Sequence, residues 1–147
     1  MATLGKYTLP DNLYYDRENH TWLRWDNGLV TVGLDMLGQE SIGDMAYISL
    51  EAVGKSIRRA GSLGSLEAAK MVAPILAPIS GKIVAVNAEV VRYPQLINTH
   101  PYTDGWLLVV EPSDWATESQ ELVGGAAQVA QFLADEVVRY REQGWVE

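Results

Sequence analysis

Residues 61–87 read GSLGSLEAAKMVAPILAPISGKIVAVN, and this stretch decides the fold of the chain. Short apolar runs alternate in it with glycine and proline, a spacing that is typical of short strands and not of helices. Lys70 stands between a strand predicted to end near residues 66–69 and a strand predicted to begin near Val72. We therefore expect a hairpin that carries Lys70 at its tip, clear of the body of the domain.

The sequence on both sides of this hairpin continues the β pattern. Strands are predicted at 21–25 and 29–34, joined by Asn27-Gly28, a dipeptide that suits the positive φ angles of a tight turn. One short helix is predicted to end near Ser41, and a further strand is predicted over 105–112. Many short strands with regular turn signals predict a mainly β sandwich or barrel.

The final third of the chain has a helical pattern. Ser113 or Asp114 can cap a first helix. After Gly124-Gly125, apolar residues recur at helical spacing and Gly144 ends the pattern. These residues are Val129, Phe132, Leu133, Val137 and Tyr140. We expect the stripe to pack against the β domain.

Composition bounds the class of protein. A chain of 147 residues has the length of one domain, and five Trp and seven Tyr supply the large apolar side chains of a folded core. The net charge of −8 argues against nucleic acid as a partner, because phosphate backbones are bound by basic surfaces. Basic protein partners fit this charge better.

Several site classes have no support in the sequence. The chain contains no cysteine and two histidines, His20 and His100, which disfavours disulfides, a cysteine nucleophile and a zinc site. It contains no phosphate-binding glycine loop and no nucleophile elbow, so we expect a protein that is not an enzyme. Neither a signal peptide nor a membrane segment is recognisable, and we expect a cytoplasmic location without membrane contact.

A lysine in a turn is usually a solvated charge, so the case for Lys70 depends on its surroundings. Seven segments between about Tyr15 and Leu122 resemble, in order and at similar spacing, the H protein of the glycine cleavage system. They are NHTWLRW, NGLVTVGL, LGQESIGDMAYISLEAVGKSI, GSLGSLEAAK, LAPISGKIVAVN, PQLIN and PYTDGWLLVVEPSD.

The resemblance implies a barrel-sandwich hybrid of the lipoyl and biotinyl type, with a short helix in its N-terminal half and helices at its C-terminal end. It divides the chain into an N-terminal extension, 1–14, a lipoyl-carrier domain, 15–123, and a C-terminal helix that packs on the domain, 124–147. Lipoate would be joined as an amide to Lys70, which makes the chain a carrier between enzymes.

The resemblance also names residues around the arm. A lipoate-protein ligase or lipoyl transferase would attach the lipoate, and Glu67 and Met71, on the same hairpin, are candidates for its recognition. His20, Thr21 and Pro74 are expected near a cavity that receives the arm. For His20 we favour packing beside Trp22 over contact with the arm, because a lone histidine has many structural roles.

Two positions depart from the family pattern. The family usually has a glutamate where this chain has Thr21, and an aspartate where it has Pro74. Both acids lie beside the bound amine in the family, and an unpaired cation is costly to bury. Ala68 and Met71 are milder changes. A cationic methylamine cargo therefore lacks its usual partners here.

These departures favour a related class, the H-protein-like lipoate-binding proteins of cytoplasmic sulfur oxidation. Such a carrier would serve a heterodisulfide-reductase-like complex and hold a sulfur-bearing intermediate that needs no carboxylate. The alternative is the H protein of the glycine cleavage system, which carries an aminomethyl group. Its partners would be glycine decarboxylase, aminomethyltransferase and dihydrolipoamide dehydrogenase.

Two lesser alternatives remain. Residues 67–71, EAAKM, differ from the biotin-acceptor sequence EAMKM at Ala69 alone, which would make the chain a biotin carrier. The hairpin could also belong to an unmodified scaffold that binds partner proteins. Of the remaining candidates, His100 is expected in a loop and Arg58-Arg59 at a solvated edge.

Overall fold

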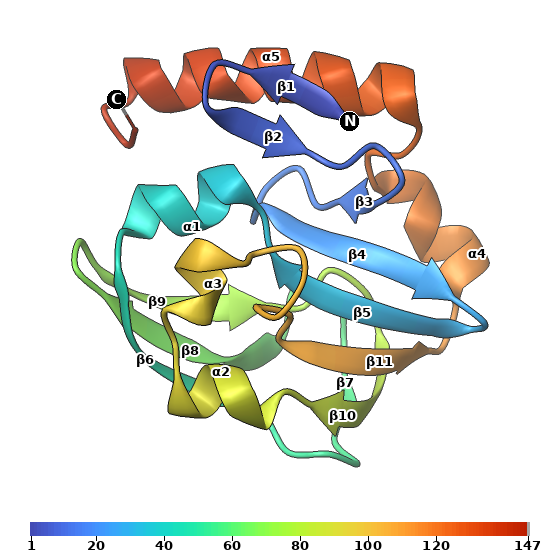
Figure 1. Cartoon of the computed structure of the whole chain (residues 1–147). Coiled ribbons are helices and arrows are strands. Elements are labelled where there is room, and N and C mark those ends of the chain that lie inside the picture. The colour runs from blue at the N-terminus through green and yellow to red at the C-terminus, as the bar shows by residue number, and fades with distance from the viewer. Residues whose placement is uncertain (147) are drawn as a thin grey trace.

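The computed structural model describes residues 1–146, in which three antiparallel sheets are surrounded by helices (Figure 1). The six-stranded sheet has the order β3 (Tyr14–Tyr15), β4 (Thr21–Asp26), β5 (Leu29–Leu34), β11 (Leu108–Pro112), β10 (Gly81–Val86) and β7 (Ser56–Ile57). The three-stranded sheet has the order β6 (Met45–Leu50), β8 (Ser62–Ala68) and β9 (Val72–Leu76), and β1 (Ala2–Leu4) pairs with β2 (Tyr7–Leu9).

The two larger sheets share one hydrophobic core. Ile48, Leu66 and Ile75 from the three-stranded sheet are buried in the same cluster as Leu23 and Val32 from the six-stranded sheet. The buried residues of β8 are Leu63 and Leu66, and they are three positions apart in a strand whose register with β9 shifts between Ser62 and Gly64. The predicted mainly β barrel-sandwich fold is therefore confirmed.

The turn between β4 and β5 follows the sequence prediction. Asn27 and Gly28 have φ angles of 51° and 80°, and Thr21 to Asp26 pair in register with Leu34 to Leu29. The register places Trp22 opposite Gly33, where any side chain would begin 2.4 Å from the Trp22 ring. Gly33 therefore leaves room for the buried indole, whose nitrogen donates to the carbonyl oxygen of Pro101 at 2.8 Å.

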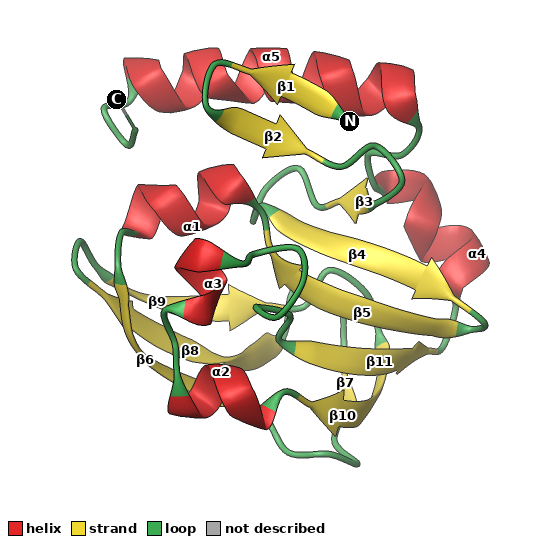
Figure 2. Ribbon diagram, viewed as in Figure 1, coloured by secondary structure: helices red, strands yellow, loops and turns green. Residues whose placement is uncertain are grey.

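Six helical segments surround the sheets (Figure 2). They are α1 (Met36–Ile42), α2 (Ala88–Arg92), α3 (Leu96–Thr99), α4 (Trp115–Glu118), a short 3₁₀ helix (Ser119–Glu121) and α5 (Ala126–Glu142). The predicted helix near Ser41 is α1, and Asp114 caps α4 through the backbone N–H of Thr117. No pattern predicted α2 and α3, because helices of five and four residues are too short to show a periodicity.

A second hydrophobic cluster lies between α5 and the N-terminal hairpin (Figure 1). Tyr7, Leu9 and Leu13 are buried there against Phe132 and Val137 of α5. The first residues, expected as an extension, thus form β1 and β2 and cover α5. No helix in residues 1–146 is long and apolar enough to cross a membrane.

Candidate functional site

Lys70 lies at the tip of the β8–β9 hairpin, and the backbone of this tip is fixed by the connection between α1 and β6. The N–H of Ala69 donates to the carbonyl oxygen of Asp44 at 2.9 Å, and the N–H of Lys70 donates to that of Ile42 at 3.0 Å. Ala68 closes the turn with a 3.0 Å bond to Met71. These bonds hold the backbone of the hairpin tip in place, and the Lys70 side chain that it carries is exposed.

The Lys70 side chain lies along the end of α1. Its Nζ donates to the carbonyl oxygen of Glu40 at 3.2 Å, and an added side chain at Gly43 would begin 3.3 Å from Lys70 Cγ. Gly43 has a φ of 87°, a conformation that favours glycine. Glycine at this position both allows the turn and leaves room for the lysine.

A cavity of about 330 Å³ opens beside this hairpin, large enough for a small organic group. Its walls come from the hairpin, from the start of β4, from α1 and from the end of α5. The lining residues are Glu18, Asn19, Thr21, Leu34, Gly38, Ser41, Ile42, Leu66, Met71, Ala73, Pro74, Ile75, Leu76, Tyr140 and Trp145. Since Met71 adjoins Lys70, the cavity begins next to the lysine.

Four polar residues, Glu18, Asn19, Thr21 and Ser41, are among the residues that line the cavity. Thr21 is 1% exposed, and its Oγ1 is a buried atom without a hydrogen-bond partner among the described residues. Glu18, an exposed residue, and Asn19 line the same cavity. The hydroxyl of Tyr7, which lies in the second core and does not line the cavity, is likewise without a partner among the described residues. The case for an arm in this cavity therefore rests on its position beside Lys70 and on its largely apolar lining.

His20, beside Thr21, is fully buried between two carboxylates. Its Nδ1 lies 2.7 Å from Asp35 Oδ2, and its Nε2 lies 2.8 Å from Glu136 Oε1. Burial alone would lower the pKa of His20, but the charges and hydrogen bonds of both acids outweigh it and raise the pKa to about 9. His20 is therefore an imidazolium at neutral pH and donates from both nitrogens.

Glu136 continues this network toward the surface. Arg139 binds it through Nε and Nη2 at 2.8 and 2.7 Å. Burial tends to raise the pKa of Glu136, but Arg139 and His20 lower it to about 2. The ring of His20 also packs on Phe132, at 5.0 Å between ring centroids, and on Tyr140, at 4.8 Å. His20 thus joins α5 to the start of β4.

The structure separates the residues proposed from sequence into two groups. Thr21, Met71 and Pro74 line the cavity, whereas His20 and Glu67 are not among the described residues of its lining. Glu67 is exposed on β8, where the strand register places it between Tyr47 and Val72.

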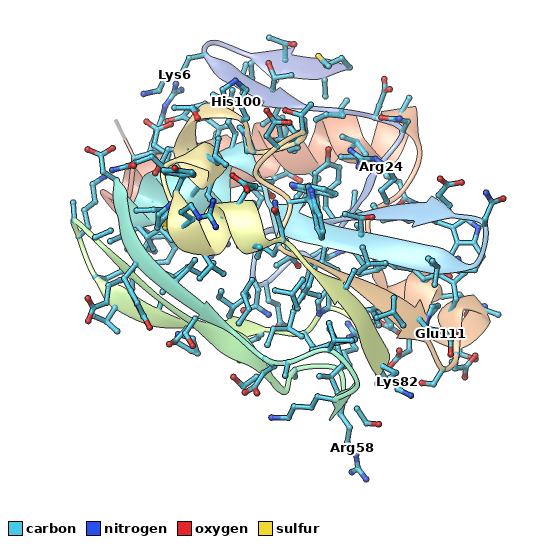
Figure 3. The ribbon with its side chains drawn as sticks, turned by 60° about the horizontal axis from the view of Figure 1, so that its bottom comes forward. Lys6, Arg24, Arg58, Lys82, His100 and Glu111 are labelled. Atoms are coloured by element: carbon cyan, nitrogen blue, oxygen red, sulfur yellow. The ribbon has the colours of Figure 1, made fainter. Side chains whose placement is uncertain are left out.

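Other singled-out residues lie away from the cavity. His100 is exposed at the end of α3, and Arg58 points into solvent from the turn after β7 (Figure 3). Trp115 is partly buried and stacks on Trp25 at 4.8 Å.

Glu18, Tyr140 and Trp145 are among the lining residues that sequence reasoning did not assign to the cavity. Tyr140 was predicted as part of a packing stripe, and it is buried as such while it also faces the cavity. Glu18 follows Asp16, whose Oδ1 accepts from the Glu18 N–H at 3.0 Å, and this Asx turn was the one local signal near it. Nothing local marks Trp145, because the fold brings it to the cavity.

Comparisons with known proteins agree with this geometry. The family model for the glycine cleavage H-protein matches residues 13–136. A glycine cleavage system H protein from Salinibacter ruber is 37% identical over 118 residues, which are 80% of this chain and 94% of that protein. Glycine cleavage system H protein 4 of Aquifex aeolicus is 35% identical over 137 residues, 93% of this chain and 78% of its own.

A solved structure gives the same result. The crystal structure of a glycine cleavage system H protein from Mycobacterium marinum superposes with a TM-score of 0.68 and is 34% identical in sequence. The match covers 71% of this chain and 87% of the Mycobacterium marinum chain. Proteins of this kind carry lipoate covalently on a lysine and are carriers without catalytic activity of their own. On its sequence and its fold, this chain belongs to the glycine cleavage H-protein family.

Proposed function

We propose that Lys70 carries the lipoyl group and that the chain works as the carrier of a glycine cleavage system. The observation that carries this proposal is the exposed Lys70 at an ordered hairpin tip, beside a largely apolar cavity. Its partners would be glycine decarboxylase, aminomethyltransferase and dihydrolipoamide dehydrogenase, and we place it in the cytoplasm.

The side chains around Lys70 suit attachment by a ligase. Lys70 is exposed, so a lipoate-protein ligase or lipoyl transferase can reach its Nζ. Glu67 and Met71 are exposed on the same hairpin, and we propose that the ligase contacts them. When bound, the lipoyl group supplies a dithiol–disulfide couple on a long flexible chain.

Glu18 supports the aminomethyl group as the cargo. The preference for a sulfur cargo rested on the missing acids at Thr21 and Pro74, yet another acid, Glu18, is among the residues that line the same cavity. A carboxylate at the cavity can pair with a cationic amine and offset the cost of taking it out of water. The relatives from Salinibacter ruber and Aquifex aeolicus are glycine cleavage system H proteins, which also favours glycine cleavage over sulfur oxidation.

A sulfur-bearing cargo is the second candidate, served by a heterodisulfide-reductase-like complex. One observation favours it: Thr21, the buried polar residue of the cavity, is neutral, and Glu18 is an exposed residue. A neutral cargo could use the Thr21 hydroxyl and would need no carboxylate in the cavity.

Methylamine transfer distinguishes the two cargoes. The lipoylated protein is incubated with glycine and a glycine decarboxylase, and the loaded form is measured by intact mass. The glycine cleavage role predicts loading, and it predicts slower loading or faster loss of the amine in Glu18→Gln. Glu111→Gln, an exposed acid on β11, is the control and should match the unchanged protein. A lipoylated protein that accepts no methylamine would favour the sulfur-bearing cargo.

A further inference from the structure

The end of α5 forms a wall of the cavity from a part of the chain that lies outside the family match. The family model ends at Glu136, whereas Tyr140 and Trp145 line the cavity. Figure 1 shows the C-terminal end of α5 on the same side of the molecule as the tip of the β8–β9 hairpin. Tyr140 and Trp145 therefore lie beyond the residues that the family model matches.

The wall has a defined geometry. Gly144, with a φ of 76°, turns the chain back, and the N–H of Trp145 donates to the carbonyl oxygen of Tyr140 at 3.0 Å. The two rings meet edge to face, 5.1 Å apart at 86°. Val146 is buried in the second core, which holds the turn down. Trp145 is 44% exposed, so it covers the cavity without belonging to the core.

The buried network fixes where this wall stands. His20 contacts Glu136 and Tyr140 of α5, and its other partner, Asp35, caps α1 by accepting from the N–H of Gly38 at 2.9 Å. Gly38 lines the cavity. His20 therefore sets the distance between the α1 wall and the α5 wall without touching the cavity itself.

We infer that the Tyr140–Trp145 turn covers the loaded arm of Lys70 and shelters its sulfur atoms from reagents in solution. The inference rests on the proposed function, since it needs a lipoyl group on Lys70. Met71, the neighbour of Lys70 in the chain, lines the cavity together with the two rings, so an arm that enters from Lys70 would lie beside them. Removal of the half-exposed Trp145 ring opens the cavity to water while the core stays intact.

Thiol reactivity measures this shelter. The lipoylated protein is reduced, and one thiol of the arm is alkylated with bromoethylamine, so that a carbon–sulfur bond forms and bromide leaves. The rate at which the remaining thiol reacts with an aromatic disulfide reagent is then recorded. The rate of thiol–disulfide exchange depends on how easily the reagent reaches the thiol. We therefore expect Trp145→Ala to raise the rate at which the remaining thiol reacts by about fivefold or more. Trp145→Phe should retain most of the protection.

Two controls separate the shelter from other effects. Val138→Ala changes an exposed residue of α5 and should leave the rate unchanged. Trp145→Ser is a second way to remove the ring while Val146 stays in the core, and it should react as fast as Trp145→Ala. Equal rates in the unchanged protein and both ring-removed forms would overturn the inference.

The failure of the inference is distinguishable from failure of the proposed function. Intact mass reports the lipoyl group and the added aminoethyl group before any rate is measured. A protein that carries both groups but reacts equally with and without Trp145 contradicts the shelter alone. A protein that takes up no lipoate contradicts the proposed function, and the shelter with it.

Discussion

His20 Nε2 lies 2.8 Å from Glu136 Oε1, and this contact joins two residues 116 positions apart in the sequence. Asp35 Oδ2 lies 2.7 Å from the other ring nitrogen, so the imidazolium is held between α5 and the cap of α1. A buried cation between two acids couples the C-terminal helix to the β-sandwich. The stability of that coupling depends on pH.

The first prediction concerns this pH dependence. The pKa of His20 is raised from 6.5 to about 9, so its contribution to stability is complete below pH 6.5 and is lost as the pH rises through 9. Such a shift corresponds to a loss on the order of 3 kcal/mol in the free energy of unfolding. Urea unfolding at about pH 6 and pH 9.5 measures it. An equal or greater stability at the higher pH would contradict the network.

The contribution of Glu136 to stability is lost at low pH, whereas that of His20 is lost at high pH. The pKa of Glu136 is lowered from 4.5 to about 2, so its contribution is complete above pH 4.5 and is lost as the pH falls through 2. These two groups together give greatest stability between pH 4.5 and 6.5.

The second prediction tests the network by substitution. Glu136→Gln leaves the buried His20 cation with one acid, and we expect a loss of roughly 2 kcal/mol in the free energy of unfolding. The pKa of His20, measured by NMR titration, should fall. Asp135→Asn, an exposed neighbour on α5, is the control. A His20 pKa that stays the same in Glu136→Gln would rule out the contact as its cause.

The third prediction concerns the unpaired hydroxyl. Thr21→Val keeps the shape of the side chain and removes a buried polar atom without a partner, so the unloaded protein should gain up to about 1 kcal/mol of stability. The methylamine-loaded form should release its amine faster, because a polar contact is lost. Thr31→Val on β5 serves as the control. A slower release from Thr21→Val would show that the hydroxyl does not hold the arm.

The fourth prediction concerns Gly43, which supports the hairpin tip that carries Lys70. Gly43→Ala and Gly54→Ala both place a side chain at a positive φ, and each should cost about 1 kcal/mol. Gly43 lies against Lys70 Cγ, whereas the position at Gly54 is open. Lipoylation by the ligase should therefore slow in Gly43→Ala alone. Equal rates in the two variants would mean that the position of the tip does not matter.

Local patterns predicted the central part of the molecule. The Asn27-Gly28 turn, α1 and the strands of the hairpin around Lys70 depend on residues close in sequence, and each follows its prediction. The expectation that Lys70 stands clear of the domain was wrong, because the tip bonds to the α1–β6 connection and the Lys70 side chain lies along α1. The N-terminal hairpin and the shorter helices α2 and α3 depend on tertiary contacts and left no periodic signal.

The cavity was harder to predict because its walls come from distant segments. Thr21, Met71 and Pro74 were expected near an arm, but Glu18 and Trp145 meet them through the fold. The inference that this chain lacks an acid for a cationic cargo was incomplete for that reason. The acids were identified as missing because the aligned positions hold Thr21 and Pro74. Glu18 is an acid that lines the same cavity from a different position in the sequence.

Attachment of lipoate to Lys70 is tested most directly by the mass of the protein after co-expression with a lipoate-protein ligase. We expect an increase by one lipoyl group, its loss in Lys70→Arg, and its retention in Lys82→Arg, which changes another exposed lysine. A mass that never increases, or an increase that survives Lys70→Arg, would contradict Lys70 as the point of attachment.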